Sequence, residues 1–173
     1  MKDIGGYFGL ELGEKNDVDK EFTFTLNSCR NALLLLLLHY KYKKIHIPYY
    51  TCEVIIDVIK KSGVDYLFYT INEDLEIQNI HVRENEALLY TNYFGIKDNY
   101  IKSISKRYKN LVIDNAQAFY SSPLDDVDTI YSPRKFFGLP DGGGLFTTSN
   151  IDFEAYPIDH SYGRSSHLLK RTD

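Results

Sequence analysis

The chain has 173 residues, of which 43% are hydrophobic and 25% are charged, and its formal net charge is −4. These values suit a globular domain with a real core, and the scattered Lys and Arg residues argue against a nucleic-acid partner. The longest apolar run, residues 32–38, is too short to cross a bilayer, which needs about 20 residues. With no secretion signal and no disulfide framework, we expect a cytoplasmic protein without membrane contact.

Strands and helices alternate along the predicted elements. Strands are predicted at residues 22–27, 44–47, 64–71, 87–90, 111–114, 129–131 and 145–148, and helices at residues 29–42, 52–61 and 100–108. Ser28 is a candidate N-cap of the first helix, and Gly63 is a candidate C′ residue of the second. This order predicts an α/β fold, in which a mostly parallel sheet is flanked by helices. Residues 161–173 are expected to begin a helix or a connection.

Four polar side chains follow four of the predicted strands. Asp114 ends one strand, while Ser28, Asn92 and Lys135 come shortly after three others. Ligands of open parallel sheets bind beyond the carboxyl ends of the strands. We therefore expect these four side chains to lie around one crevice.

Asp114 and Lys135 are the two groups that pyridoxal phosphate (PLP) most needs from a protein. A carboxylate can hold the pyridinium nitrogen of the cofactor, and a lysine can form a Schiff base with its aldehyde. Ser28 and the next two residues, Cys29 and Arg30, open a helix whose free N–H groups can bind a phosphate, and Ser132 can add a hydroxyl. The glycines at 142–144 would let the backbone pass close to the cofactor or to a subunit interface.

Each of these residues also has a plain structural interpretation. An aspartate at the end of a strand is often a helix cap, and a lysine beside phenylalanines often extends its amine to solvent. The Ser28 turn can be an N-cap alone, and a nucleotide-binding α/β domain that uses this turn is a further alternative. The sequence has no phosphate-binding glycine motif in the right place for that alternative. The five histidines have no metal-ligand spacing.

The order of these motifs resembles the DegT/StrS family of PLP-dependent sugar aminotransferases, which have the aspartate-aminotransferase-like fold. Residues 4–8 (Ile-Gly-Gly-Tyr-Phe) are similar to the start of family members. Residues 28–33 (Ser-Cys-Arg-Asn-Ala-Leu) are similar to the phosphate turn, with Cys29 in place of a glycine and Arg30 in place of a threonine. Residues 48–51 (Pro-Tyr-Tyr-Thr) are similar to a Pro-x-Phe-Thr segment near the cofactor ring.

The second half of the resemblance covers the catalytic groups. Residues 92–95 are similar to a His-x-x-Gly loop, with Asn92 at the histidine, and residues 114–117 to an Asp-x-Ala-His/Gln motif. Lys135 and residues 141–143 are similar to the Schiff-base lysine and its glycine loop. Some relatives have a histidine at the lysine position and act as dehydratases, so Lys135 favours transamination. The family serine lies five residues before the lysine, whereas Ser132 lies three residues before Lys135.

The resemblance implies a role for each matched residue. Asp114 would meet the pyridine nitrogen, Ala116 would lie under the ring, and Gln117 would reach the cofactor hydroxyl. Tyr50 is the candidate for stacking on the ring, since the usual aromatic position is Cys52 here. The implied reaction moves an amino group from glutamate to a keto-sugar nucleotide for polysaccharide or related biosynthesis, and the implied assembly is a homodimer.

Family members are about twice as long as this chain. We therefore expect residues 1–173 to form an incomplete PLP-binding large domain that lacks the small C-terminal domain. A second hypothesis is a truncated, non-catalytic remnant or interaction subunit that keeps the motifs without the reaction.

Overall fold

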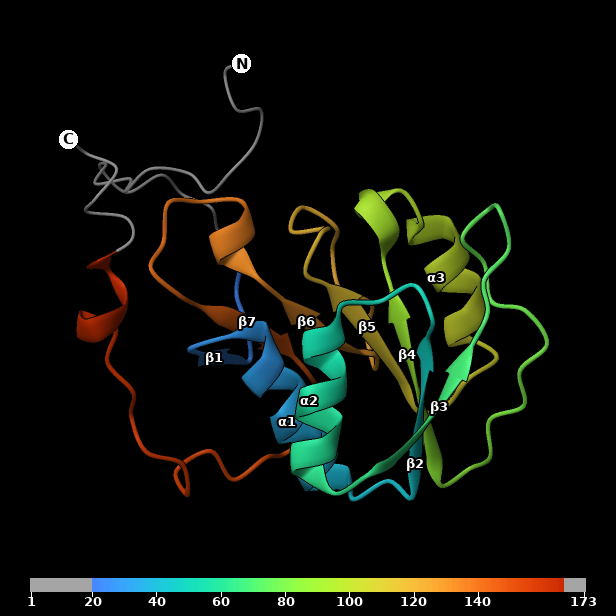
Figure 1. The fold of residues 1–173 in the computed structure, drawn as a ribbon, viewed down its shortest axis with the longest axis horizontal. Helices are drawn as coiled ribbons and strands as arrows, with labels where there is room; N and C mark the ends of the chain where they lie inside the picture. The colour runs from blue at the N-terminus through green and yellow to red at the C-terminus, as the bar shows by residue number, and fades with distance from the viewer. Residues whose placement is uncertain (1–19, 167–173) are drawn as a thin grey trace, which may run out of the picture.

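The computed structural model describes residues 20–166, and within them one seven-stranded sheet forms the centre (Figure 1). Its strands are β1 (Phe24–Leu26), β2 (Lys44–Pro48), β3 (Asp65–Tyr69), β4 (Glu86–Thr91), β5 (Leu111–Asn115), β6 (Asp128–Tyr131) and β7 (Gly143–Phe146). They lie in the order β1-β7-β6-β5-β4-β2-β3. Strands β2 to β6 run parallel, whereas β7 is antiparallel to both β6 and β1. The prediction of a mostly parallel α/β sheet is confirmed.

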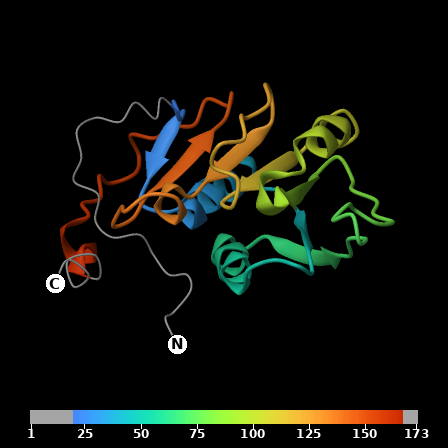
Figure 2. The same ribbon diagram turned by 90° about the horizontal axis from the view of Figure 1, so that it is seen from above.

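Helices cover both faces of this sheet (Figure 2). On one face lie α1 (Cys29–Tyr40) and α2 (Glu53–Ser62), whose buried side chains share a core with Ile45, Leu89 and Val112. On the other face lies α3 (Asp98–Ser105), which packs against Leu88 and Ile113. Neighbouring residues of a strand enter opposite cores because side chains alternate along a strand. This alternation also decides which strand-end side chains can reach the site.

Two helix ends lie at the capping residues that the sequence predicts. Ser28 is the N-cap of α1, and its Oγ accepts a hydrogen bond from the Asn31 N–H at 3.3 Å. Gly63 ends α2 in the left-handed region at φ 74°, where a residue without Cβ is least strained. The third helix begins two residues before the predicted start and ends three before the predicted end.

One strand lies earlier than predicted. Residues 145–148 were expected to form it, but β7 spans Gly143–Phe146, because Gly143 and Gly144 pair with β1 on one side and Gly144 pairs with β6 on the other. Three short 3-10 turns are present in the described part: η1 (Tyr93–Gly95), η2 (Pro133–Lys135) and η3 (Tyr162–Arg164). Residues 4–8 and 167–173, which carry two of the sequence predictions, lie outside the described residues.

In residues 20–166, every helix is too short or too polar to cross a membrane.

Candidate active site

A cavity of about 260 Å³ lies where the parallel strands β2, β4, β5 and β6 end. Its lining residues are Tyr50, Thr51, Cys52, Thr91, Tyr93, Phe94, Asp114, Ala116, Gln117 and Lys135. Thr91 and Asp114 belong to the last residues of β4 and β5, and the other lining residues come from the segments that follow the strands. Five residues proposed from the sequence, Tyr50, Asp114, Ala116, Gln117 and Lys135, therefore lie around one cavity.

Asp114 supplies a buried carboxylate to this cavity. It is the fourth residue of β5, its exposed fraction is 7%, and its Oδ1 accepts a hydrogen bond from the Ala116 N–H at 2.8 Å. Burial raises the pKa of the Asp114 carboxyl, while the Ala116 N–H and the charge of Lys135 oppose that shift. A desolvated carboxylate of this kind is stabilised by a cation placed against it.

Lys135 reaches the same cavity from the next strand of the sheet. It closes the turn η2, where its N–H donates to the Ser132 carbonyl at 3.1 Å. The Lys135 charge lowers the pKa values of both Asp114 and Cys29, although burial dominates each of those values. The amine and the carboxylate therefore line the same cavity, where the charge of Lys135 favours the ionised form of Asp114.

An aromatic wall stands on the side of β2 and β4. The rings of Tyr50 and Tyr93 are stacked, with centroids 5.4 Å apart and planes 9° from parallel, and the Tyr93 hydroxyl donates to the Tyr50 carbonyl at 2.9 Å. Phe94 has φ 57°, a left-handed conformation that is rare for a bulky side chain and often accompanies function. Such a wall can accept the flat face of a ring.

The phosphate turn expected from the sequence lies next to this cavity. Cys29, the first residue of α1, is buried, and the pKa of its thiol is raised by burial and by the charge of Asp114. Arg30 is exposed and lines a neighbouring cavity of about 350 Å³, together with Ser28 and Arg134. The start of α1 therefore faces basic side chains on one side and the Asp114–Lys135 pair on the other.

Gly143 allows the backbone of β7 to touch this turn. A Cβ atom at position 143 would lie 2.1 Å from the carbonyl carbon of Ser28 and 2.4 Å from the amide nitrogen of Cys29. No side chain fits at such distances, so the absence of a Cβ is required here. The sequence predicted a close backbone approach at 142–144, and the partner of that approach is the Ser28 turn itself.

Besides the three residues of the phosphate turn, two proposed residues, Asn92 and Ser132, lie outside the cavity. Asn92 is fully buried, its Nδ2 donates to Asp98 and to Ser121, and its Oδ1 accepts from the Lys97 N–H. Since side chains alternate along β4, Thr91 faces the cavity and Asn92 faces the side of α3. Ser132 is also buried and contributes its carbonyl to the η2 turn.

Thr91, Tyr93 and Phe94 line the cavity but were not proposed from the sequence. Thr91 pairs in register with Asp114 on the neighbouring strand, so the two side chains emerge on the same face. Residues 87–91 (Ala-Leu-Leu-Tyr-Thr) show no polar alternation, so the only signal for Thr91 was its position at the end of the predicted strand. The positions of Tyr93 and Phe94 depend on the η1 turn, which the sequence pattern does not reveal.

The residues around the cavity fit PLP. A buried carboxylate suits a pyridinium nitrogen, an amine within reach suits an aldehyde, and stacked aromatic rings suit a flat heterocycle. The N–H groups at the start of a twelve-residue helix suit a phosphate, and the missing Cβ of Gly143 brings a second backbone segment against that turn.

Solved structures of aminotransferases resemble this chain. NtdA from Bacillus subtilis, solved with bound PMP, is 19% identical with a TM-score of 0.60, and the match covers 75% of this chain and 34% of NtdA. The sugar aminotransferase CalS13 from Micromonospora echinospora is 16% identical with a TM-score of 0.58, and the match covers 72% of this chain and 41% of CalS13. PseC from Helicobacter pylori, an aminotransferase involved in the biosynthesis of pseudoaminic acid, is 16% identical with a TM-score of 0.56. The match covers 73% of this chain and 40% of PseC.

In all three cases the match spans less than half of the solved chain. No protein-family model matches the sequence, and no curated protein matches it. At these identities the similarity establishes the fold. The chain therefore has the aspartate-aminotransferase-like fold of solved sugar aminotransferases, which confirms the fold that the sequence resemblance predicts.

Proposed function

We propose that this chain binds PLP and carries the catalytic lysine of a sugar aminotransferase. The observation that carries the proposal is that Lys135, Asp114 and the aromatic side chains of Tyr50 and Tyr93 line one cavity. The fold supports the same reaction class, because the solved structures that resemble this chain include sugar aminotransferases.

Bound PLP supplies an electron sink for the bond that breaks at the amino-bearing carbon of the substrate. Asp114, as an anion, would hold a proton on the ring nitrogen and so deepen that sink. Lys135 would hold the cofactor covalently and, once released from it, would move a proton to or from the substrate carbon. Both roles need a carboxylate and an amine on one cavity, which Asp114 and Lys135 provide.

The remaining residues would hold the cofactor in place. Ala116 would lie under the ring, Gln117 would reach its hydroxyl, and Tyr50 would stack on it. The phosphate would lie against Ser28, Cys29 and Arg30, with Ser132 nearby. For Asn92 we propose a supporting role, in which its three hydrogen bonds hold the loop that carries Tyr93.

We propose that the substrate is a keto-sugar nucleotide, that glutamate is the amino donor, and that the product enters polysaccharide or related biosynthesis in the cytoplasm. PseC, an aminotransferase involved in the biosynthesis of pseudoaminic acid, supports this substrate class. We also propose that residues 1–173 act as the PLP-binding large domain and that two copies associate. Exposed aromatic side chains near the cavity, such as Tyr50 and Phe94, support self-association.

The test is an absorbance titration of the purified chain with PLP, followed by borohydride reduction and mass spectrometry of the labelled peptide. We expect a saturable band and a single label on Lys135. Lys135→Ala should abolish both signals, while Lys60→Ala, which removes an exposed lysine from α2, should leave them unchanged. A label spread over surface lysines, or a band that survives in Lys135→Ala, would contradict the lysine assignment.

The same protein also tests the alternative of a non-catalytic remnant. If Lys135 is labelled but glutamate produces no spectral change in the bound cofactor, binding without transamination is the better description. A spectral change with glutamate that requires Lys135 supports the enzyme.

A further inference from the structure

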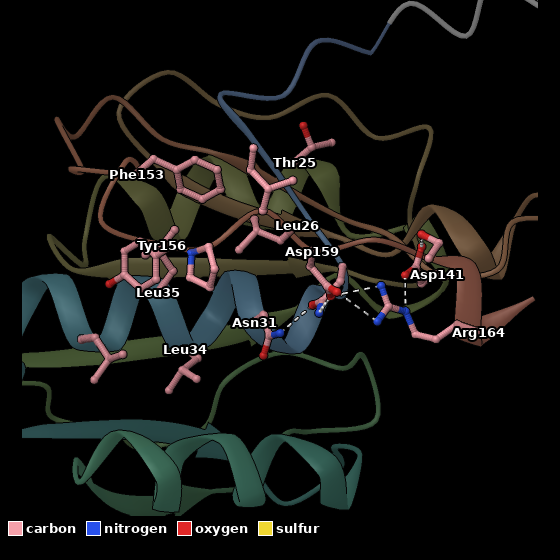
Figure 3. Close-up of a pocket in the computed structure, with 15 residues that line it drawn as sticks. Thr25, Leu26, Asn31, Leu34, Leu35, Asp141, Phe153, Tyr156, Asp159 and Arg164 are labelled. Carbon is pink, nitrogen blue, oxygen red and sulfur yellow. Dashed lines mark hydrogen bonds and ion pairs between the residues drawn. The ribbon is translucent and has the colours of Figure 1, made fainter.

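One arginine joins two carboxylates beside the phosphate turn (Figure 3). Arg164 Nε donates to Asp141 Oδ2 at 2.5 Å, and its Nη1 and Nη2 lie 3.3 and 3.0 Å from the Asp159 oxygens. Ser161 Oγ donates to the other oxygen of Asp141 at 2.8 Å. We call these four residues, together with Asn27, the Arg164 clamp. The clamp connects the loop after Lys135 with residues 159–164.

The Asp141 side of the clamp leads to the backbone of the phosphate turn. The next residue, Gly142, donates its N–H to the Asn27 carbonyl at 2.9 Å and forms a bridge with Ser28. Gly143 then packs directly against Ser28. Since the Asp141 side chain is only 16% exposed, its bond to Arg164 is partly shielded from water. Holding Asp141 therefore holds the glycine loop against the turn.

The Asp159 side leads to the side chain that precedes the turn. Asp159 Oδ2 accepts from Asn27 Nδ2 at 2.5 Å. Asn27 Oδ1 in turn accepts from Asn31 Nδ2 at 2.5 Å and from Ser28 Oγ at 3.3 Å. The N-cap hydroxyl and the first turn of α1 are thus tied to Asp159 through one amide.

Charge gives Arg164 a second role. The N-terminus of α1 favours an anion, but Asp141 and Asp159 would oppose one if their charges were not balanced. Arg164 pairs with both carboxylates at the polar end of a cavity of about 600 Å³, and its single positive charge offsets half of their combined charge. The other walls of this cavity include Leu26, Leu34 and Phe153, which weaken the screening of charges on that side.

We propose that Arg164 is a positioning residue for the phosphate turn, which it holds in shape and next to which it offsets part of the negative charge of Asp141 and Asp159. This inference rests on the proposed function, because the anion that the turn would receive is the phosphate of PLP. Arg164 does not line the cavity that contains Lys135 and Asp114, although it shares the neighbouring cavity of about 350 Å³ with Ser28 and Arg30. Its hydrogen bonds reach the turn through Asp159 and Asn27 and through Asp141 and the glycine loop.

The experiment compares two ligands that differ only in the phosphate, PLP and pyridoxal. In Arg164→Gln we expect PLP to bind about tenfold more weakly, the effect of losing hydrogen bonds between charged groups. Pyridoxal affinity should change less than twofold, about the level of an unrelated surface substitution. An equal loss for both ligands, or no loss for PLP, would overturn the proposal.

Hydrogen exchange provides a readout that needs no cofactor. The amides of residues 27–31 should exchange faster in Arg164→Gln, while those of β4 and β5 should not change. Unchanged exchange at 27–31 would overturn the proposal, even if the chain binds no PLP and the proposed function fails. If the chain binds no PLP but exchange at 27–31 is faster, the role of the Arg164 clamp is supported and the proposed function is not. The failure of one proposal can therefore be told from the failure of the other.

Two further variants keep the test decisive. Arg164→Lys keeps the charge but loses the two-pronged geometry, so its PLP affinity should lie between those of wild type and Arg164→Gln. If Arg164→Gln does not fold, wild-type affinity and exchange in Arg164→Lys would overturn the proposal. Arg83→Gln removes an exposed arginine just before β4, at the amino ends of the parallel strands, and should behave as wild type in both measurements.

Discussion

Gly143 and Ser28 lie so close that their backbones leave no room for a side chain. A Cβ at position 143 would be 2.1 Å from the Ser28 carbonyl carbon, and that carbon is backbone that cannot rotate away. The contact joins the start of β7 to the N-cap of α1. The shape of the phosphate turn therefore depends on a residue more than one hundred positions later in the chain.

Gly143→Ala should displace this turn and destabilise the protein. We expect a loss of about 3 kcal/mol in the free energy of unfolding, because overpacking against a rigid backbone costs about 1–3 kcal/mol and sometimes more. Urea denaturation followed by circular dichroism measures it. Gly163→Ala is the matched control, since its new Cβ would have no atom within 4 Å. A Gly143→Ala variant as stable as Gly163→Ala would contradict the contact.

Asp114→Asn should stabilise the protein without cofactor and weaken its binding of PLP. Burial raises the pKa of Asp114, so the folded state holds its ionised form at a cost above that pKa, and a neutral amide removes the cost. The gain in thermal stability should be present at pH 7 and should vanish at low pH, where the carboxyl is protonated in both states. PLP affinity should fall about tenfold through loss of the charged partner.

Differential scanning calorimetry and the PLP titration measure these two effects. Asp125→Asn, at an exposed position in the loop between β5 and β6, is the control and should change neither quantity. If Asp114→Asn bound PLP as tightly as wild type, Asp114 would not be the partner of the ring nitrogen.

The sequence was sufficient for those features that depend on local chemistry. Ser28 and Gly63 mark helix ends because caps are local. Asp114 and Lys135 were expected to share one crevice because strand ends collect at one edge of a sheet, and they line one cavity. Asn92 shows the limit of this reasoning. A strand end that differs by one residue reverses the face that a side chain occupies, and Thr91 faces the cavity instead.

Long-range contacts could not be predicted from the pattern. The position of β7 depends on glycines, which carry no hydrophobic signal, and on pairing with β1 at the far end of the chain. The contact of Arg164 with Asp141 and Asp159 likewise depends on the path of residues 151–164, for which the sequence has no periodicity. Both features lie next to the phosphate turn. The sequence therefore indicates which residues line the candidate site, but not which contacts hold the phosphate turn in place.

Self-association can be tested at the exposed apolar side chains near the cavity. Ile96 is 71% exposed and directly follows η1, two residues after Phe94. If two copies associate through this face, Ile96→Asp should weaken the dimer at least about tenfold, as expected for a charge placed in an apolar contact. Light scattering over a concentration series measures the change. Leu67→Asp alters an exposed leucine on the edge strand β3 and should leave the dimer intact.

The buried pair of His46 and Glu86 predicts a stability that depends on pH. His46 Nε2 lies 2.8 Å from Glu86 Oε2, both side chains are less than a tenth exposed, and the Arg83 N–H also donates to Glu86. The hydrogen bond with His46 is the main cause that lowers the pKa of Glu86 below its ordinary value of 4.5. A carboxyl with a lowered pKa in the folded state adds stability above its unfolded pKa and loses it as the pH falls through the folded pKa.

Glu86→Gln should therefore cost about 2 kcal/mol at pH 7, the range for hydrogen bonds to charged groups. The cost should stay level down to about pH 5 and then shrink as Glu86 of the wild type takes up a proton. Urea denaturation of both proteins at pH 7, 5 and 4 follows the difference. Glu84→Gln, two residues earlier and exposed, should show no such pattern. A Glu86→Gln cost that is the same at pH 7 and pH 4 would mean that packing, and not the charge of Glu86, stabilises this end of β4.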